Sequence, residues 1–252
     1  MTRALRRLAG PAALVLLWWL STRLDWVDAR TLPSPGKVLE AGRDAFNSGE
    51  LGAALRASLR RVLVGTLIGI SAGLGVATIA GISRLGDDLL DSTMQVVKAV
   101  PTIALSPLLI VWLGIDEAPK LTLIALSTSM PIYMNTHGAI RSVDKRLVDA
   151  ARTLGVRNWG LVRHVIAPAA VPGFLVGLRI SLANAWLALI VAEQLNAKHG
   201  LGQMMADARS YFRLDVMLLV VVIYAALGLL SYSFVRFLER ELLQWRRGFD
   251  GR

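Results

Sequence analysis

The residues whose types and spacing could best do chemistry are Asp149, Ala150 and Ala151, followed by Gly155 and, thirteen residues further on, by Pro168. A carboxylate beside two small alanines suits contact with another protein. The alanines let a second surface come close, and the carboxylate forms part of a polar rim. This chemistry is docking rather than catalysis. An ordinary solvated loop is the alternative that the segment alone leaves open.

The same segment predicts its own local structure. Residues 147–154, which end at Leu154, suit a short helix, and Gly155 can end that helix in the left-handed conformation. Asn158 and Trp159 allow a second helix to start, and Pro168 is expected to stop the chain before the next apolar run. We therefore expect a compact helix-turn-helix within residues 141–168.

The rest of the sequence has no recognisable catalytic pattern. Cysteine is absent, which excludes a disulfide framework and a thiolate nucleophile or metal ligand. The sequence contains no G-x-x-x-x-G-K-[ST] phosphate loop, no H-E-x-x-H and no G-x-S-x-G. His137, His164 and His199 are isolated in sequence, so structural or solvated roles are expected for them rather than metal ligation. We expect a chain that binds no metal or cofactor and catalyses no reaction.

Hydropathy indicates a membrane protein. Of the 252 residues, 54% are hydrophobic, the mean hydropathy is +0.53, and several apolar runs approach the roughly 20 residues that cross a bilayer. Surface helices of a soluble domain need a polar face, which such runs lack. The net charge of +10 would suggest nucleic acid in a soluble protein. In a membrane protein Lys and Arg gather in cytoplasmic loops, so no nucleic-acid partner is expected.

The apolar runs predict an all-α fold with about six membrane spans. The expected spans are residues 9–20, 54–82, 93–113, 119–137, 169–193 and 216–238. No small-x-small cleavage site follows the first run, so we expect a retained helix rather than a signal peptide. Two prolines and a glycine within residues 32–36 forbid a continuing helix, and an amphipathic surface segment follows. Glu193 and Gln194 mark the outer end of the fifth span, where a binding protein could dock.

Prolines and glycines inside the spans predict how the helices pack. Pro101 and Pro131 suggest kinked helices, either around a pathway or within a packed bundle. Gly65, Gly69 and Gly73 fall four residues apart, on one helical face, and this small-xxx-small spacing lets helix backbones approach closely. Internal packing is favoured for this face over a seam between two copies.

Charge predicts the orientation. The loop 141–164 holds six basic residues against two acids, and both termini are basic as well. The terminal basic residues are Arg3, Arg6, Arg7, Arg240, Arg246 and Arg247. The positive-inside rule therefore places the loop and both termini in the cytoplasm. The segment 23–56 disagrees with this topology, because the topology places its five basic residues on the outer side. Five acidic residues in the same segment reduce its net positive charge.

The docking segment resembles the cytoplasmic coupling loop of bacterial ABC importer permeases. That pattern is Glu-Ala-Ala, three residues, Gly, nine residues, then Ile-x-Leu-Pro, and here it reads Asp149-Ala150-Ala151, Gly155 and Val-Ile-Ala-Pro168. The resemblance covers nearly the whole chain from the first span. Residues 32–35, 114–120, 131–133 and 177–193 are similar to permeases for aliphatic sulfonates, taurine and nitrate, and residues 112–117 and 190–193 are most similar to the alkanesulfonate members.

This resemblance implies one permease domain over residues 1–252, with a core over 54–238 and a cytoplasmic coupling loop over 141–168. It implies a homodimer in the bacterial inner membrane, an extracytoplasmic solute-binding protein that delivers the substrate, and two cytoplasmic ATPases that hold ATP and Mg. Closure of the ATPases would push on the loop, and the fifth span would transmit the push. The residues implied in coupling are Asp149, Ala150, Ala151, Leu154, Gly155 and Pro168.

Arg179 lies about ten residues into the fifth span, where an unpaired guanidinium costs about 3 kcal/mol or more. It either helps an anionic sulfonate pass, since a guanidinium fork matches its oxygens, or it forms a structural pair with a carboxylate or with freed carbonyls. Further candidates line the pathway or hydrogen-bond between helices. They are Ser181, Asn184, Trp186, Thr102 and Ser106. Lys98, near the cytoplasmic start of the third span, is expected to extend to the membrane interface.

Two other classes of membrane protein are alternatives to the importer interpretation. A secondary transporter predicts inverted repeats, and the sequence has no such self-similarity. A membrane scaffold without transport activity has no need of Arg179 or of proline-kinked spans, but the sequence does not exclude it. Within the importer class, sulfonate, taurine, nitrate and a heterocyclic vitamin precursor all stay open as substrates.

Overall fold

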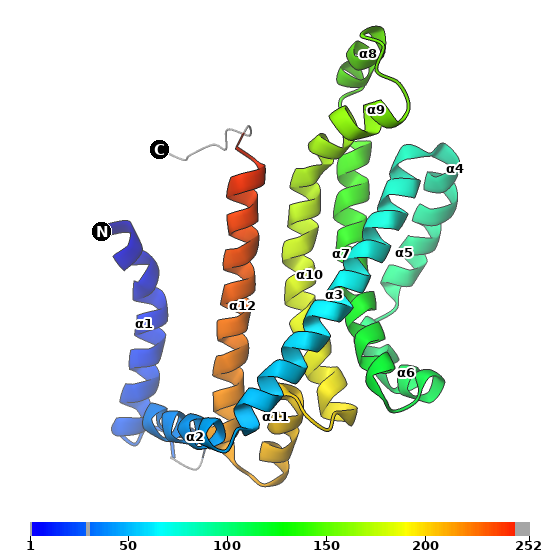
Figure 1. Cartoon of the computed structure of the whole chain (residues 1–252). Helices are drawn as coiled ribbons and strands as arrows, with labels where there is room; N and C mark the ends of the chain where they lie inside the picture. The colour runs from blue at the N-terminus through cyan, green and yellow to red at the C-terminus, as the bar shows by residue number, and fades with distance from the viewer. Residues whose placement is uncertain (1, 29–30, 245–252) are drawn as a thin grey trace. The chain divides into compact units, whose positions relative to one another are not determined.

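The computed structural model describes residues 2–28 and 31–244, and every regular element in that part of the chain is a helix (Figure 1). This confirms the all-α fold class. The helices form two compact units, Met1–Ser58 with Glu193–Ala225, and Leu59–Ala192 with Ala226–Arg252. Arg246 and Arg247 of the basic tail lie outside the described residues.

The first unit contains three helices of its own and parts of three longer ones. Its own helices are α1 (Thr2–Arg23), α2 (Pro35–Asn47) and α11 (Leu201–Ser210), and the shared ones are α3 (Glu50–Ile82), α10 (Ala167–Asn196) and α12 (Leu214–Leu242). The Trp18 indole N–H donates to the Pro33 carbonyl at 3.0 Å. The Ser34 hydroxyl accepts the Lys37 N–H, and Pro35 occupies the first turn of α2. The predicted helix break and the amphipathic segment after it are confirmed.

A buried carboxylate fastens the turn between α10 and α11 in this unit. Glu193 is fully buried, and its carboxylate accepts the Gly202 N–H at 2.8 Å and the Ser58 hydroxyl at 2.9 Å. Gly200 has φ +149, and a Cβ there would lie 2.4 Å from the Glu193 carboxylate. The Glu193 carboxylate is therefore not available to a partner, because it holds the start of α11. Docking of a binding protein at this end of α10 stays a prediction.

The second unit packs α3, α7 (Glu117–Arg141) and α10 side by side (Figure 1). Gly65, Gly69 and Gly73 face α7, and a Cβ at Gly69 would lie 1.9 Å from the Thr128 hydroxyl oxygen. Internal packing of the glycine face is therefore confirmed. The Ser181 hydroxyl on α10 donates to the Thr128 carbonyl at 2.6 Å, so a single turn of α7 touches both neighbouring helices.

The third expected span is broken rather than continuous. The helical segment that contains it begins earlier, at Arg84, and comprises α4 (Arg84–Gly86), η1 (Asp87–Asp91), α5 (Ser92–Ala99), η2 (Thr102–Leu105) and α6 (Ser106–Leu113). Its two halves are bent by 78°. Pro101 causes the break, because it lacks an N–H and restricts Val100 to the extended conformation it adopts, with φ −81 and ψ 122. Pro107 lies in the first turn of α6, where a proline is tolerated.

Three described helices are long and apolar enough to cross a membrane, or four if the bent pair forms one span. The three are Glu50–Ile82, Trp159–Leu195 and Leu214–Leu242. The first expected span appears as a shorter apolar helix, Ala12–Arg23, and α7 has the length of a span but carries many polar residues. The number of six spans therefore stays a prediction.

Candidate functional site

The predicted docking helix is α8 (Lys145–Thr153). The Asp144 carboxylate caps its start by accepting the Arg146 N–H at 2.9 Å. At its end, Gly155 has φ +84, its N–H donates to the Arg152 carbonyl, and the Val156 N–H donates to the Ala151 carbonyl, each at 3.0 Å. These two bonds form a Schellman motif. The predicted helix and its left-handed glycine end are confirmed.

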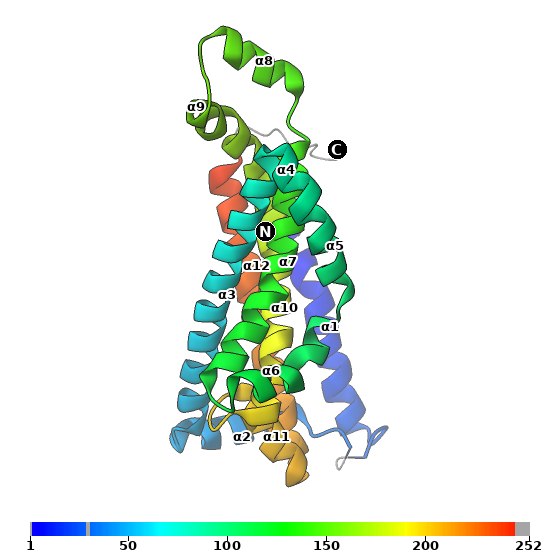
Figure 2. The same cartoon turned by 90° about the vertical axis from the view of Figure 1, so that its right-hand side faces the viewer.

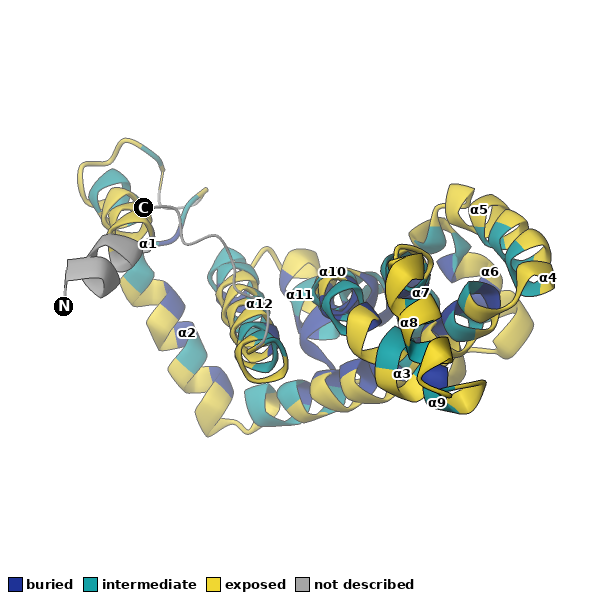
Figure 3. Ribbon diagram, turned by 90° about the horizontal axis from the view of Figure 1, so that it is seen from above, coloured by how far each residue is buried: buried dark blue, intermediate teal, exposed yellow. Residues whose placement is uncertain are grey.

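The side chains of α8 are available to a partner. No residue of α8 is buried, and Figures 1 and 2 place it beyond the ends of α7 and α10, within the same unit. Asp149 and Arg152 form a solvent-exposed pair at 3.8 Å. Leu147 is 58% exposed and Leu154, just after the helix, is 83% exposed. Figure 3 colours most of α8 as exposed. Exposed apolar side chains rimmed by charge are typical of an interaction surface.

Pro168 does not stop the chain, contrary to the prediction. After Asn158, α9 (Trp159–Leu161), the π-helical turn η3 (Val162–Ile166) and α10 continue as one helix from Trp159 to Leu195. In this turn the Ala167 N–H donates to the Val162 carbonyl, five residues back, and the wider turn accommodates the proline, which has no N–H to donate. The docking segment is therefore joined to the interior of the second unit by one continuous helix.

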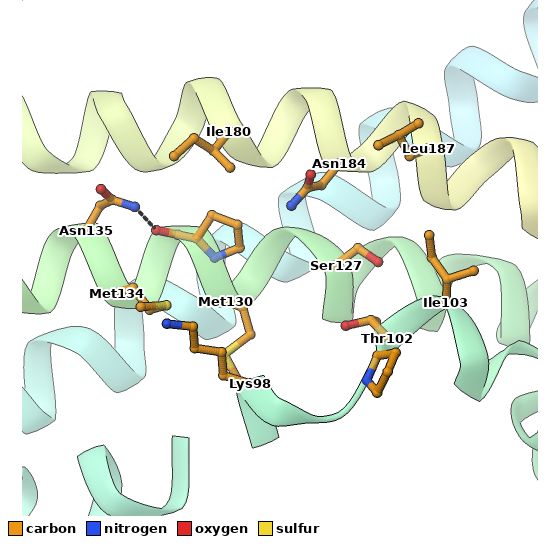
Figure 4. A pocket seen from close by; sticks show the side chains of 12 residues that line it. Lys98, Thr102, Ile103, Ser127, Met130, Met134, Asn135, Ile180, Asn184 and Leu187 are labelled. Atoms are coloured by element: carbon orange, nitrogen blue, oxygen red, sulfur yellow. Dashed lines mark hydrogen bonds between the residues drawn. The ribbon is translucent and has the colours of Figure 1, made fainter. Parts of the chain in front are cut away.

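A cavity of about 610 Å³ lies where the broken helix meets α7 and α10 (Figure 4). Most of its lining is apolar. The polar side chains that line it are Lys98, Thr102, Ser127, Asn135 and Asn184. Of these, Asn135 donates to the Pro131 carbonyl at 2.8 Å. The others leave donors directed at the cavity, which suits a small polar or anionic solute.

The structure separates the predicted pathway residues into two groups. Thr102 and Asn184 line the cavity. The remaining hydroxyl and indole groups bond to other parts of the protein instead. The Ser106 hydroxyl donates to the Ile103 carbonyl at 2.6 Å, and the Trp186 indole N–H donates to the Ser231 hydroxyl at 3.0 Å. Together with Ser181, these residues make the hydrogen bonds within and between helices that were the alternative interpretation.

Arg179 forms a structural pair. Its guanidinium donates to both carboxylate oxygens of Glu239 on α12 and lies 5.5 Å from the centre of the Tyr232 ring. Lys98 is the cationic side chain that lines the cavity, and it is exposed. Its extension to the membrane interface stays a prediction. The sequence signal for its place on the cavity is weak: a cation three residues before the proline that breaks the helix.

Breaking the Arg179 pair is expected to affect stability more than substrate handling. Arg179→Met leaves Glu239 without its charged donor, which costs about 1–3 kcal/mol and lowers the melting temperature by roughly 2–12 °C. Exchanging the two charges, Arg179→Glu with Glu239→Arg, should restore part of the stability and keep uptake. Thermal unfolding and uptake of the three variants check this. A swapped pair that is stable but does not transport would assign Arg179 to the substrate pathway.

Charged contacts hold α7 at both of its ends. The Arg61 guanidinium donates to both carboxylate oxygens of Glu117 at 2.7–2.8 Å, which holds the pKa of this exposed carboxyl below its usual range. At the other end His137 lies 2.8 Å from Asp87, which also pairs with Arg141 at 2.8 Å. His137 thus has a structural role, and no group of side chains suited to a metal ion occurs among the described residues.

Comparison with known proteins identifies a family of membrane transport proteins. Residues 65–244 match the family described as the inner membrane component of binding-protein-dependent transport systems. The chain is 39% identical to a putative aliphatic sulfonates transport permease protein of Bacillus subtilis, over 96% of this chain and 87% of that protein. It is 42% identical to a protein of the same description from Escherichia coli, over 95% and 91%.

A solved structure shares the fold. The crystal structure of an amino acid ABC transporter with histidines superposes with a TM-score of 0.66, covering 80% of this chain and 97% of that chain, at 18% identity. At this identity the likeness shows the fold alone.

Proposed function

Because the chain belongs to the family of inner membrane components of binding-protein-dependent transport systems, we propose that it imports aliphatic sulfonates as the permease subunit of an ATP-driven transporter. The observation that supports the substrate is the identity of 39% and 42%, over nearly the whole chain, to two bacterial proteins described as putative aliphatic sulfonates transport permeases. Taurine, nitrate and a vitamin precursor are the alternative solutes within the same importer class.

In the proposed assembly, other subunits supply ATP hydrolysis and delivery of the substrate. Two copies of the permease, each a single domain over residues 1–252, form the pathway, and two cytoplasmic ATPases hold ATP and Mg. A solute-binding protein delivers the sulfonate from outside. Both termini and the coupling loop lie in the cytoplasm, in agreement with the positive-inside rule. This chain then carries no catalytic residue and binds no cofactor.

We propose α8 as the contact with the ATPase. Its support is that α8 has no buried residue, ends in a stable glycine cap, and leads into a continuous helix that carries Asn184 to the cavity. ATP-driven closure of the ATPase pair displaces α8. The long helix passes that displacement to the cavity, and the two permease copies then rock against each other.

Growth on alkanesulfonate as sole sulfur source tests the proposal. A strain lacking this gene, or the gene of the partner ATPase, should fail on butanesulfonate and grow normally on sulfate. A plasmid copy of the wild type should restore growth. Normal growth on butanesulfonate with a defect on taurine or nitrate would show that the imported solute is taurine or nitrate instead. Uptake that persists without the ATPase would overturn the ATP-driven importer in favour of a secondary transporter.

A further inference from the structure

We propose that the cavity at the break between α5 and α6 is a binding site for a small organic anion, with Lys98 as its cationic contact. The inference rests on the proposed function and deepens it, because it gives the permease its own recognition of the solute's charge. The cavity lies wholly within the second unit and draws its lining from the broken helix, α7 and α10 (Figure 4).

The first argument is the unbalanced charge of Lys98. Among the described residues, no carboxylate pairs with its ammonium group, whereas Arg179 and Arg141 each pair with one. A charged side chain in a membrane span faces the protein interior or a water-filled cavity. The Lys98 side chain is exposed rather than buried, so its charge does not by itself require a partner. Because the cavity lining includes no Asp or Glu, an anion in the cavity can reach this charge without competition from a carboxylate.

The second argument is a set of unused hydrogen-bond donors. The Ser127 hydroxyl is buried, lines the cavity and has no partner among the described residues. In the same part of the chain the Asn184 amide and the Thr102 hydroxyl make no hydrogen bond either. Buried polar groups are normally paired, so an unpaired hydroxyl directed at a cavity indicates a bound molecule or water. Each of these groups can donate to an anion's oxygens.

The third argument is the broken backbone. Non-helical backbone at membrane depth is tolerated where protein surrounds it or where it lines a water-filled cavity. The break at Pro101 lines this cavity, which therefore offers room for a solute between the break and the helices α7 and α10. Its volume of about 610 Å³ falls within the range typical of small-molecule sites.

The lining defines the class of ligand. Met130, Met134, Ile180 and Leu187 provide an apolar wall beside the donors. Methionine adapts its shape to different apolar groups. An anionic head group on a short alkyl chain fits both parts of the cavity, whereas a cation finds no carboxylate and a neutral alcohol leaves Lys98 unpaired. The head group is a sulfonate or a carboxylate.

Thermal unfolding of the purified permease–ATPase complex measures binding directly. A ligand that binds the folded state raises the melting temperature according to its concentration relative to its Kd. We expect butanesulfonate to raise it for the wild type and for Lys98→Arg. Lys98→Met should need at least tenfold more ligand for the same rise. Lys37→Met, which removes an exposed lysine on α2, serves as the control and should match the wild type.

The ligand series separates the alternatives. Butyrate acting as strongly as butanesulfonate would support a site for organic anions of either head group. An equal rise with 1-butanol, or a rise with sulfate alone, would overturn the organic-anion site. If Lys98→Met does not fold, Asn184→Ala replaces it, with an expected loss of about threefold. An unchanged affinity in a folded Lys98→Met or Asn184→Ala variant would also overturn the proposal.

Uptake distinguishes this inference from the proposed function. In liposomes with the binding protein, Lys98→Met should raise the KM for butanesulfonate about tenfold, and Lys98→Arg should keep it within about threefold of the wild type. Wild-type uptake with an unchanged KM in Lys98→Met would overturn the anion site and leave the importer intact. Absence of wild-type uptake, with a Lys98-dependent rise in melting temperature, would overturn the sulfonate importer and leave the site intact.

Discussion

Replacing Gly69 by leucine is expected to leave almost no folded permease in the membrane. A Cβ at this position would lie 1.9 Å from the Thr128 hydroxyl oxygen and 2.5 Å from the Ala125 carbonyl oxygen. The second atom belongs to the backbone of α7, so no side-chain rotation relieves the contact. Adding bulk to a packed interface costs about 1–3 kcal/mol when side chains can adjust, and we expect more here. The helices α3 and α7 must separate.

Gly75 on the same helix provides the matched control. A Cβ at Gly75 would meet nothing within 4 Å, so Gly75→Leu adds the same side chain to α3 without a steric conflict. The yield of monodisperse protein after detergent extraction, and its melting temperature, should fall sharply for Gly69→Leu and little for Gly75→Leu. Equal losses at the two positions would show that the loss at Gly69 does not come from a clash with α7.

Local signals made much of the fold predictable. The spacing of Gly65, Gly69 and Gly73 indicated one closely packed helix face, and the structure places that face against α7. The end of α8 was predictable because Gly155 needs no distant partner to adopt its left-handed conformation. Hydropathy alone treated residues 93–113 as one span. Pro101 correctly indicated a kink there, but the size of the turn, 78°, was not predictable from the sequence.

The partners of buried charges were less predictable, because they depend on residues far apart in sequence. The sequence left both a pathway role and a structural pair open for Arg179, because its partner Glu239 is sixty residues away in the chain. The place of Lys98 on the cavity was not predictable either, because it depends on how the broken helix meets α7 and α10. The π-helical turn before Pro168 was missed for a different, local reason: a proline near a predicted helix start is typical of a break.

Ala151→Trp is expected to reduce uptake at least 100-fold while the permease itself stays folded. No residue of α8 is buried, and the helix is held by its own caps at Asp144 and Gly155, so a large side chain there costs the isolated permease little. The same side chain blocks close approach of an ATPase surface to the helix. Copurification of the ATPase and its stimulation by the loaded binding protein should be lost together with uptake.

The size of the side chain, rather than the loss of alanine, should decide the outcome. Ala151→Ser keeps a small residue at the same position, and we expect uptake within about threefold of the wild type. Gly155→Trp forces a residue into φ +84, which disfavours the glycine cap, and it should fail as Ala151→Trp does. An Ala151→Trp permease that still copurifies its ATPase and transports sulfonate would show that α8 is an ordinary solvated loop. The push from the ATPase would then have to enter the permease at another surface.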